Sequence, residues 1–124
     1  MAATFEGYPY QMPPGPNSFD CSSYVLEVYF DAGLPFPTGV RTAEQIRQAC
    51  TPVDGVQPGD LVFFEHTYAS GEAPGPDGHV ATHVSIVEDP AAYTVWHAVD
   101  PAVKRSAINT SYWEPKLLSI GRYR

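Results

Sequence analysis

The spacing of the apolar residues changes once along this chain, from a helical period to strand-like runs, and this change constrains the fold more than any other feature. After Asp20, apolar residues recur at the spacing of one helix face; they are Tyr24, Val25, Val28, Tyr29 and Ala32. Gly33 is expected to end that helix. A second, shorter helix is predicted over residues 42–50, where Thr42 and Gln45 have the spacing of a capping box.

Short apolar runs bounded by turn residues follow the two helical segments. They predict strands over 61–64, 84–87, 93–96 and 117–123. The opening at residues 7–17 is expected to be a loop, because its prolines remove backbone donors. Helices followed by an antiparallel sheet predict an α+β fold, with N-terminal helices packed on a small antiparallel sheet.

Length and composition narrow the class of protein. A chain of 124 residues that is 44% hydrophobic and 17% charged is expected to fold as a single domain over 1–124. Its net charge of −7 and its lack of a basic cluster argue against nucleic acid as a partner. Its apolar runs are too short for membrane insertion. No signal peptide is expected at the amino terminus, since a basic and an apolar region are both missing there.

Cys21 lies where the first helix is predicted to begin. The free N–H groups and the dipole of a helix amino terminus stabilise a thiolate, so Cys21 is a candidate nucleophile. The alternative is a small buried hydrophobic residue, which the polar neighbours of Cys21 disfavour. Cys50 lies at the end of the second helix, and a disulfide between the two cysteines is not expected.

A nucleophilic thiol needs a base, and the chain has four histidines. If the runs 84–87 and 93–96 pair as a hairpin around residues 89–90, His83 and His97 become neighbours. One ring can then act as the base and the other can orient it. For His97, a half-buried strand histidine without a catalytic role is an equally good interpretation.

The other two histidines, His66 and His79, are interpreted as loop residues without a role. His79 and His83 are four residues apart, but His83 begins a strand-like run, so zinc is disfavoured and no metal site is predicted. The loop 67–82 is long for so small a domain and is a candidate functional segment. Its acidic residues Glu72 and Asp77 are interpreted as serving solvation only.

Five motifs, in order and spacing, resemble the NlpC-type cell-wall peptidases, a papain-like cysteine peptidase family. They are Gly7-Tyr8-Pro9-Tyr10, Phe19-Asp20-Cys21-Ser22, the run from Pro58 to Phe64, the run from His83 to Val87, and Trp96-His97-Ala98. The resemblance covers nearly the whole chain. It implies a papain-like core and hydrolysis of peptidoglycan stem peptides, typically at the γ-D-glutamyl to diamino-acid bond, without a cofactor.

The resemblance also implies roles for individual residues. Cys21 matches the nucleophile, His83 the base and His97 the polar third member of the catalytic group. Tyr10 matches a tyrosine that lines the site, and its hydroxyl is expected to help hold the substrate or the oxyanion. Asp20 and Ser22 match substrate-binding residues, which in members acting on free stem peptides face the terminal amine. Capping the helix is the alternative role for Asp20.

The chemistry expected from these roles is acyl transfer through a thioester, from a resting thiolate and imidazolium. Three alternatives stay open. An amidase-type cysteine-histidine hydrolase usually completes its triad with Glu or Asn. A lipid-directed acyltransferase has its histidine before its cysteine, an order that this chain reverses. A catalytically silent wall-binding or structural module would keep the fold alone.

Delivery to the wall is a separate expectation. A protein made in the cytoplasm without a signal peptide would reach the wall after lysis, as part of a phage particle, or as part of a larger protein. A separate wall-binding domain or a virion partner is therefore expected, because a negative charge gives no attraction to anionic wall polymers.

Overall fold

The computed structural model describes residues 2–69 and 71–123. It is an α+β structure, as predicted, in which the described strands form one six-stranded antiparallel sheet. No helix among these residues has the length and apolar character that crossing a membrane requires. The elements in chain order are η1 (Ala2–Phe5), α1 (Cys21–Asp31), α2 (Ala43–Gln48), β1 (Thr51–Pro52), β2 (Leu61–Phe64), β3 (His83–Asp89), β4 (Thr94–Val99), β5 (Ala102–Ala107), η2 (Glu114–Lys116) and β6 (Leu117–Arg122).

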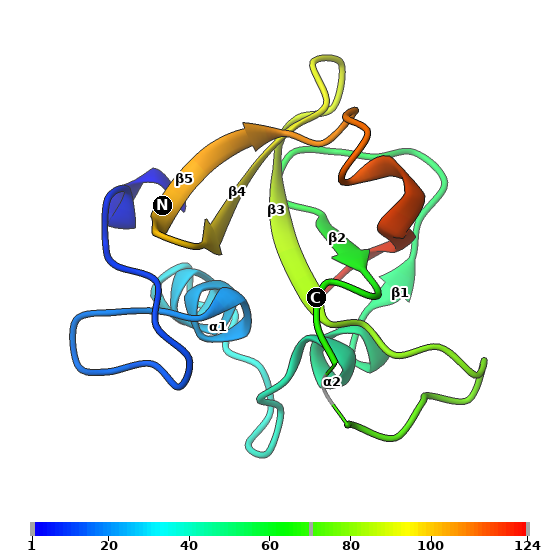
Figure 1. Ribbon diagram of the computed structural model, residues 1–124, viewed down its shortest axis with the longest axis horizontal. Helices are drawn as coiled ribbons and strands as arrows, with labels where there is room; N and C mark the ends of the chain where they lie inside the picture. The colour runs from blue at the N-terminus through cyan, green and yellow to red at the C-terminus, as the bar shows by residue number, and fades with distance from the viewer. Residues whose placement is uncertain (1, 70, 124) are drawn as a thin grey trace.

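The strand order is β1-β6-β2-β3-β4-β5, and α1 packs against β3 and β4 (Figure 1). The hairpin predicted for the runs 84–87 and 93–96 is confirmed as the β3–β4 pair, with Ile86 opposite Trp96 and Val87 opposite Val95. Strand β4 begins at Thr94, one residue later than the predicted start of the run 93–96. Tyr93 has a φ of 58°, a left-handed conformation that belongs to the turn and not to a strand.

Both helices begin at the capping boxes that their sequences encode. The Asp20 side chain accepts a hydrogen bond from the Ser23 N–H, and the Ser23 side chain accepts one from the Asp20 N–H. This pair makes Cys21 the first residue of α1. The predicted box of Thr42 is confirmed at the start of α2, although that helix ends at Gln48 and not at residue 50.

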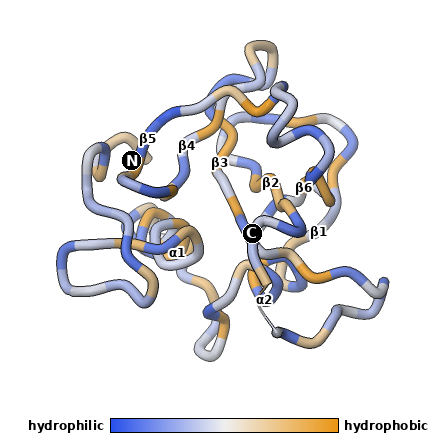
Figure 2. Tube along the Cα trace, in the orientation of Figure 1, coloured by the Kyte–Doolittle hydropathy of each residue, from blue (hydrophilic) through white to orange (hydrophobic). Residues whose placement is uncertain are grey.

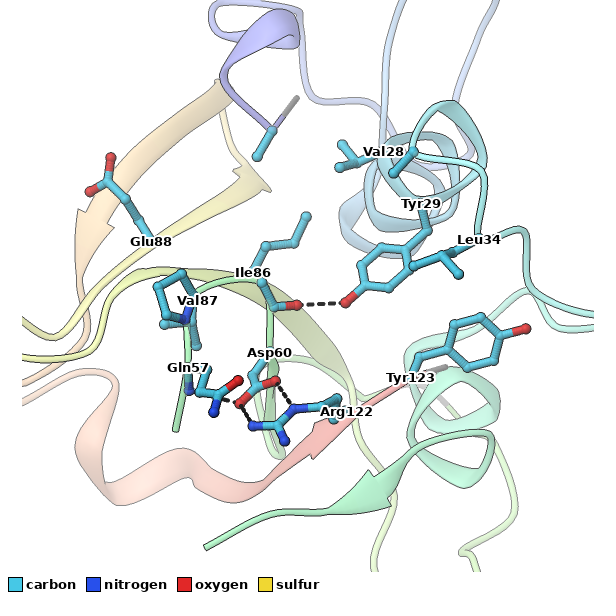
Figure 3. A pocket seen from close by; sticks show the side chains of 14 residues that line it. Val28, Tyr29, Leu34, Gln57, Asp60, Ile86, Val87, Glu88, Arg122 and Tyr123 are labelled. Carbon is cyan, nitrogen blue, oxygen red and sulfur yellow. Dashed lines mark hydrogen bonds and ion pairs between the residues drawn. The ribbon is translucent and has the colours of Figure 1, made fainter. Parts of the chain in front are cut away.

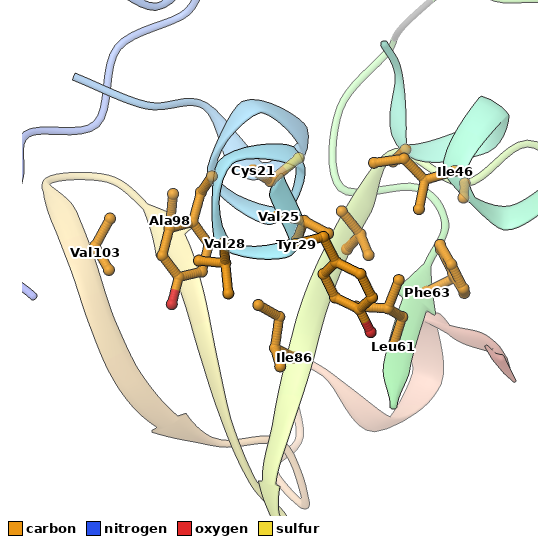
Figure 4. Packing of buried hydrophobic residues seen from close by; sticks show 14 residues of the cluster. Cys21, Val25, Val28, Tyr29, Ile46, Leu61, Phe63, Ile86, Ala98 and Val103 are labelled. Carbon is orange, nitrogen blue, oxygen red and sulfur yellow. The ribbon is translucent and has the colours of Figure 1, made fainter. Parts of the chain in front are cut away.

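The sheet is covered on both faces, and this explains why every residue of β2 is buried. On one face, α1 residues pack against Leu61, Phe63 and Ile86 (Figure 4). On the other face, Val62 and Phe64 form a second cluster with Val87 and Val95. The central strand therefore lacks the alternation of a half-exposed strand.

The edge strand β5 was not predicted from the sequence. Its middle carries Lys104 and Arg105, which are exposed. Figure 2 shows hydrophilic colouring along β5. Charged residues at a sheet edge oppose pairing with another chain, but they also hide the apolar pattern of a strand. Only Val103 is buried within β5.

A buried carboxylate holds the end of the loop 67–82 against α2. Glu44 is fully buried, and its Oε1 accepts a hydrogen bond of 2.7 Å from the Ala81 N–H. Arg47 contacts Glu44 and also both carboxylate oxygens of Asp77 at 2.9 and 3.0 Å. Glu72 accepts a hydrogen bond of 2.8 Å from the Thr42 hydroxyl. The interpretation of Glu72 and Asp77 as purely solvating residues was therefore wrong.

Replacing this buried carboxylate should destabilise the fold strongly. Glu44→Ala leaves the Ala81 N–H and part of the Arg47 guanidinium without an acceptor, so we expect the free energy of unfolding in urea to fall by about 3 kcal/mol. Glu88→Ala is the matched control, because Glu88 pairs with Arg105 at 3.3 Å near the surface. We expect that variant to lose less than about 1 kcal/mol. Equal losses would show that Glu44 does not anchor the loop.

Candidate active site

Cys21 lies where the first turn of α1 meets the first residues of β3. Its side chain is buried, and Sγ donates to the carbonyl oxygen of Thr82 at 3.8 Å. A backbone hydrogen bond from Val84, on the other side of His83, acts to lower the pKa of the thiol. Figure 4 shows Cys21 at the end of the helix that packs on β3. The thiol therefore touches the backbone on both sides of the candidate base.

The predicted proximity of the two histidines is confirmed. His83 Nε2 lies 2.9 Å from His97 Nδ1, and both side chains are buried. The β3–β4 register explains this contact, because the two residues lie diagonally across the hairpin on one face. His97 Nε2 lies 2.9 Å from the hydroxyl of Ser106 on β5. The rings thus form a hydrogen-bonded chain that crosses three strands.

Aromatic side chains enclose this chain of rings. Trp113 packs over His83 with ring centroids 5.0 Å apart and over His97 at 5.4 Å. Phe64 packs against both Trp113 and His83. Trp113 precedes η2, in a segment for which the sequence indicated no function. This packing holds the orientations of the two imidazoles, while His83 also lines the first of the hollows described next.

Two adjoining hollows meet at Cys21. The first has a volume of about 320 Å³ and is lined by aromatic residues on its far side, among them Trp113 and Tyr112. The second, of about 330 Å³, is lined by Asp20, Ser22 and Arg41. Four residues belong to both hollows: Met12, Cys21, Tyr68 and Thr82. The nucleophile candidate therefore borders two hollows whose walls differ in chemistry.

Tyr10 lines the first hollow, as expected for the tyrosine that lines the site in the family it resembles. A backbone bridge between Tyr10 and Phe19 brings the Pro-rich opening next to the start of α1. Burial, with smaller contributions from Cys21 and Asp20, raises the pKa of Tyr10 to about 12. The phenol therefore stays protonated at neutral pH and can donate a hydrogen bond.

Asp20 and Ser22 form a polar group with Arg41. No pattern in the sequence predicted that Arg41 belongs to the site. Arg41 Nη2 contacts Asp20 Oδ2 at 2.9 Å, and Nη1 donates to the Ser22 hydroxyl at 2.6 Å. Burial acts to raise the pKa of Asp20, but hydrogen bonds from Arg41 and Ser23 lower it overall. Asp20 therefore caps α1 and also carries a negative charge at the wall of the second hollow.

The electrostatics of the buried pair differ from the sequence-based expectation. Burial raises the pKa of the Cys21 thiol to about 12, and the charge of Asp20 adds to this effect. Burial, followed by the neighbouring His97, lowers the pKa of His83 well below its usual value. Burial also lowers the pKa of His97, to about 4, and the Lys104 charge contributes. These shifts favour a neutral thiol and a neutral imidazole at rest, which differs from the expected thiolate and imidazolium.

The other two histidines and Cys50 lie apart from the cluster of Cys21, His83 and His97. His79 Nδ1 contacts Glu65 at 2.8 Å, and His66 has the same carboxylate at 3.5 Å. Within residues 2–69 and 71–123, no group of three or more His, Cys, Asp or Glu side chains is arranged to hold a metal ion. Cys21 and Cys50 are both free thiols, and Cys50 packs beneath Gly121.

A larger hollow of about 490 Å³ lies at the other end of α1 (Figure 3). Its walls are mostly apolar, and several of its polar groups have partners within the wall. Arg122 binds both carboxylate oxygens of Asp60, and the Tyr29 hydroxyl donates to the Gly59 carbonyl oxygen. None of the candidate site residues lines this hollow.

Comparisons with known proteins identify the family of this chain. The NlpC/P60 family matches residues 7–122. Two proteins named probable endopeptidase p60, from Listeria seeligeri and Listeria monocytogenes, are each 34% identical over 110 residues, which is 87% of this chain. The chain spans only 18% and 19% of the lengths of these relatives.

Solved structures show the same fold. A Staphylococcus aureus protein described as similar to lipoprotein, of the NLP/P60 family, is 32% identical with a TM-score of 0.81; the match covers 98% of this chain and 38% of that one. A Bacillus cereus NlpC/P60 family protein, 24% identical, has a TM-score of 0.77 over 98% of this chain and 37% of its own. Because the family match extends over almost the whole sequence and the structural likeness over the whole fold, the chain belongs to the NlpC/P60 family.

Proposed function

We propose that this chain is a peptidoglycan hydrolase, a cysteine endopeptidase that cleaves an amide bond of the stem peptide through a thioester. The proposed scissile bond joins γ-D-glutamate to the diamino acid, and residues 1–124 act as one peptidase domain. The observation that carries the proposal is the position of Cys21, between two hollows and beside the backbone of His83, which His97 orients. The p60 relatives, named probable endopeptidases, support it.

In the acylation step, the Cys21 proton passes to Nδ1 of His83 as Sγ attacks the scissile carbonyl carbon. A neutral resting pair makes His83 a general base whose proton transfer accompanies the attack. The oxyanion that forms is stabilised by the Cys21 N–H, which has no intrahelical acceptor at the first position of α1, and by the Tyr10 hydroxyl. His83 then protonates the leaving amine as the C–N bond breaks.

In the deacylation step, His83 takes a proton from water, which attacks the thioester carbonyl. The acyl group leaves as a carboxylic acid, and the sulfur regains its proton from His83. Throughout both steps His97 accepts a hydrogen bond from Nε2 of His83, and it thereby keeps Nδ1 directed to the reacting atoms.

The two hollows suggest how a stem peptide binds. Asp20, Ser22 and Arg41 offer charged and hydroxyl groups on one side of the sulfur, where a polar part of the peptide can be held. Tyr112 and Trp113 offer apolar surface on the other side. The amidase-type alternative is less well supported, because the partner of the His83 ring is His97 and not a Glu or Asn side chain.

Delivery to the wall is the remaining part of the proposal. The net charge of −7 provides no attraction to anionic wall polymers. We infer that a wall-binding domain, a virion partner or release by lysis brings the enzyme to its substrate. The relatives, which are much longer than the matched region, are consistent with additional segments.

Removing the proposed catalytic groups should abolish hydrolysis without unfolding the protein. We expect Cys21→Ala and His83→Ala to release no stem-peptide fragments, and His97→Ala to lower turnover roughly 10-fold to 100-fold. The measurement is mass spectrometry of fragments from digested peptidoglycan, which also identifies the scissile bond. Cys50→Ala is the control and should keep full activity. Cleavage by Cys21→Ala would refute the thioester, and an inactive natural sequence would favour the silent module.

The neutral resting pair predicts the reactivity of the thiol. In a Cys50→Ser background, the alkylation rate of Cys21 by iodoacetamide should rise about tenfold per pH unit between pH 7 and 9, because only the thiolate reacts and the pKa of Cys21 is raised to about 12. Mass spectrometry of the labelled protein measures this rate. A rate independent of pH in that range would instead indicate a resting thiolate.

The Tyr10 hydroxyl should contribute to the rate and not to the fold. Tyr10→Phe removes one proposed oxyanion donor, so we expect kcat to fall by about 10²-fold with little change in KM. Tyr8→Phe is the control, because Tyr8 is exposed and lies outside both hollows. An unchanged kcat in Tyr10→Phe would remove Tyr10 from the mechanism.

A further inference from the structure

Ser106 is the last member of the hydrogen-bonded chain that starts at His83. Its hydroxyl lies 2.9 Å from Nε2 of His97, whose Nδ1 lies 2.9 Å from Nε2 of His83. His97 is fully buried, and among the described residues its two ring nitrogens have these two hydrogen-bond partners. Ser106 is half-buried on β5, and its hydroxyl proton can point to solvent.

The proposed reaction allows only one arrangement of the protons along this chain. His83 must present a lone pair at Nδ1 to accept the thiol proton, so its own proton is on Nε2 and is donated to His97. His97 must then accept at Nδ1 and carry its proton on Nε2, where Ser106 is the acceptor. In the opposite arrangement, His97 donates to His83, and His83 then carries its proton on Nδ1 and cannot act as the base.

We propose that Ser106 is a positioning residue, which accepts the Nε2 proton of His97 and so stabilises the tautomers in which His83 is a competent base. This inference rests on the proposed function, which requires that arrangement of the protons, although the tautomers can be measured without any substrate. Without the serine oxygen, a buried N–H would lose its only acceptor, which favours the opposite tautomer of His97.

The surroundings of His97 agree with this role. Lys104 lies opposite His97 in the β4–β5 register, and its charge disfavours a second proton on the ring. Trp113 packs over both rings, with centroids 5.0 Å from His83 and 5.4 Å from His97. His97 therefore stays neutral, and the choice between its two neutral forms falls to its hydrogen-bond partners.

The test combines turnover with a direct reading of the tautomer. In the natural sequence, ¹⁵N NMR of labelled imidazoles at pH 7.5 should show the proton on Nε2 of both His83 and His97, with signals assigned from His83→Gln and His97→Gln. Ser106→Ala should move the His97 proton toward Nδ1 and lower kcat about 10-fold at unchanged KM, the low end of the effects known for groups that fix the tautomer of a metal-bound histidine. Ser106→Thr, which keeps the hydroxyl, should restore both readouts.

Controls separate this inference from the proposed function. Ser119→Ala changes a half-buried serine on β6 and should leave the His97 tautomer and kcat unchanged. A proton on Nδ1 of His97 in the natural sequence would overturn the inference, and so would a Ser106→Ala variant with unchanged tautomer and kcat. If no peptide is cleaved at all, the proposed function fails, while the NMR result still decides the role of Ser106.

Discussion

The contact between the first turn of α1 and the first residues of β3 is the interaction on which the candidate site depends. Hydrogen bonds fix the position of each of the two segments. The Asp20–Ser23 capping box determines that the helix begins at Cys21. On the other side, the buried Glu44 holds the Ala81 N–H, and the next residue, Thr82, offers its carbonyl to the sulfur. A carboxylate far from the thiol in the sequence therefore helps to determine where the thiol meets β3.

Burial is the second constraint, and it determines how the site can work. The hydrogen-bond partners of the two rings within the described chain are each other and Ser106, so no carboxylate there stabilises an imidazolium. Phe64 and Trp113 pack against the His83 ring and contribute to its burial. A charged resting pair would be costly in such surroundings. Moving the proton only when the substrate carbonyl accepts the developing charge avoids that cost.

The sequence predicted the parts of the site that depend on local patterns. The helix start at Cys21 follows from a capping box within four residues, and the meeting of His83 and His97 follows from one hairpin. It failed where a residue is brought in from a distant segment. Arg41 reaches Asp20 across 21 positions, and Ser106 lies on an edge strand whose charges hide its pattern. Trp113 precedes a short 3₁₀ turn, for which apolar periodicity gives no signal.

Asp20 connects the fold to the chemistry, because its two effects on Cys21 oppose each other. As the cap, it begins the helix whose first N–H groups favour negative charge on the sulfur. As a carboxylate beside the thiol, it raises the pKa of Cys21, whereas Arg41 lowers it. Arg41 pairs with Asp20, so the Asp20 carboxylate stays ionised. The positive charge of Arg41 also offsets part of the repulsion between this carboxylate and a negative charge on the Cys21 sulfur. A cap without charge would remove the repulsion but would also remove the anchor for Arg41 at the second hollow, so the arginine and the carboxylate have to be understood as one unit.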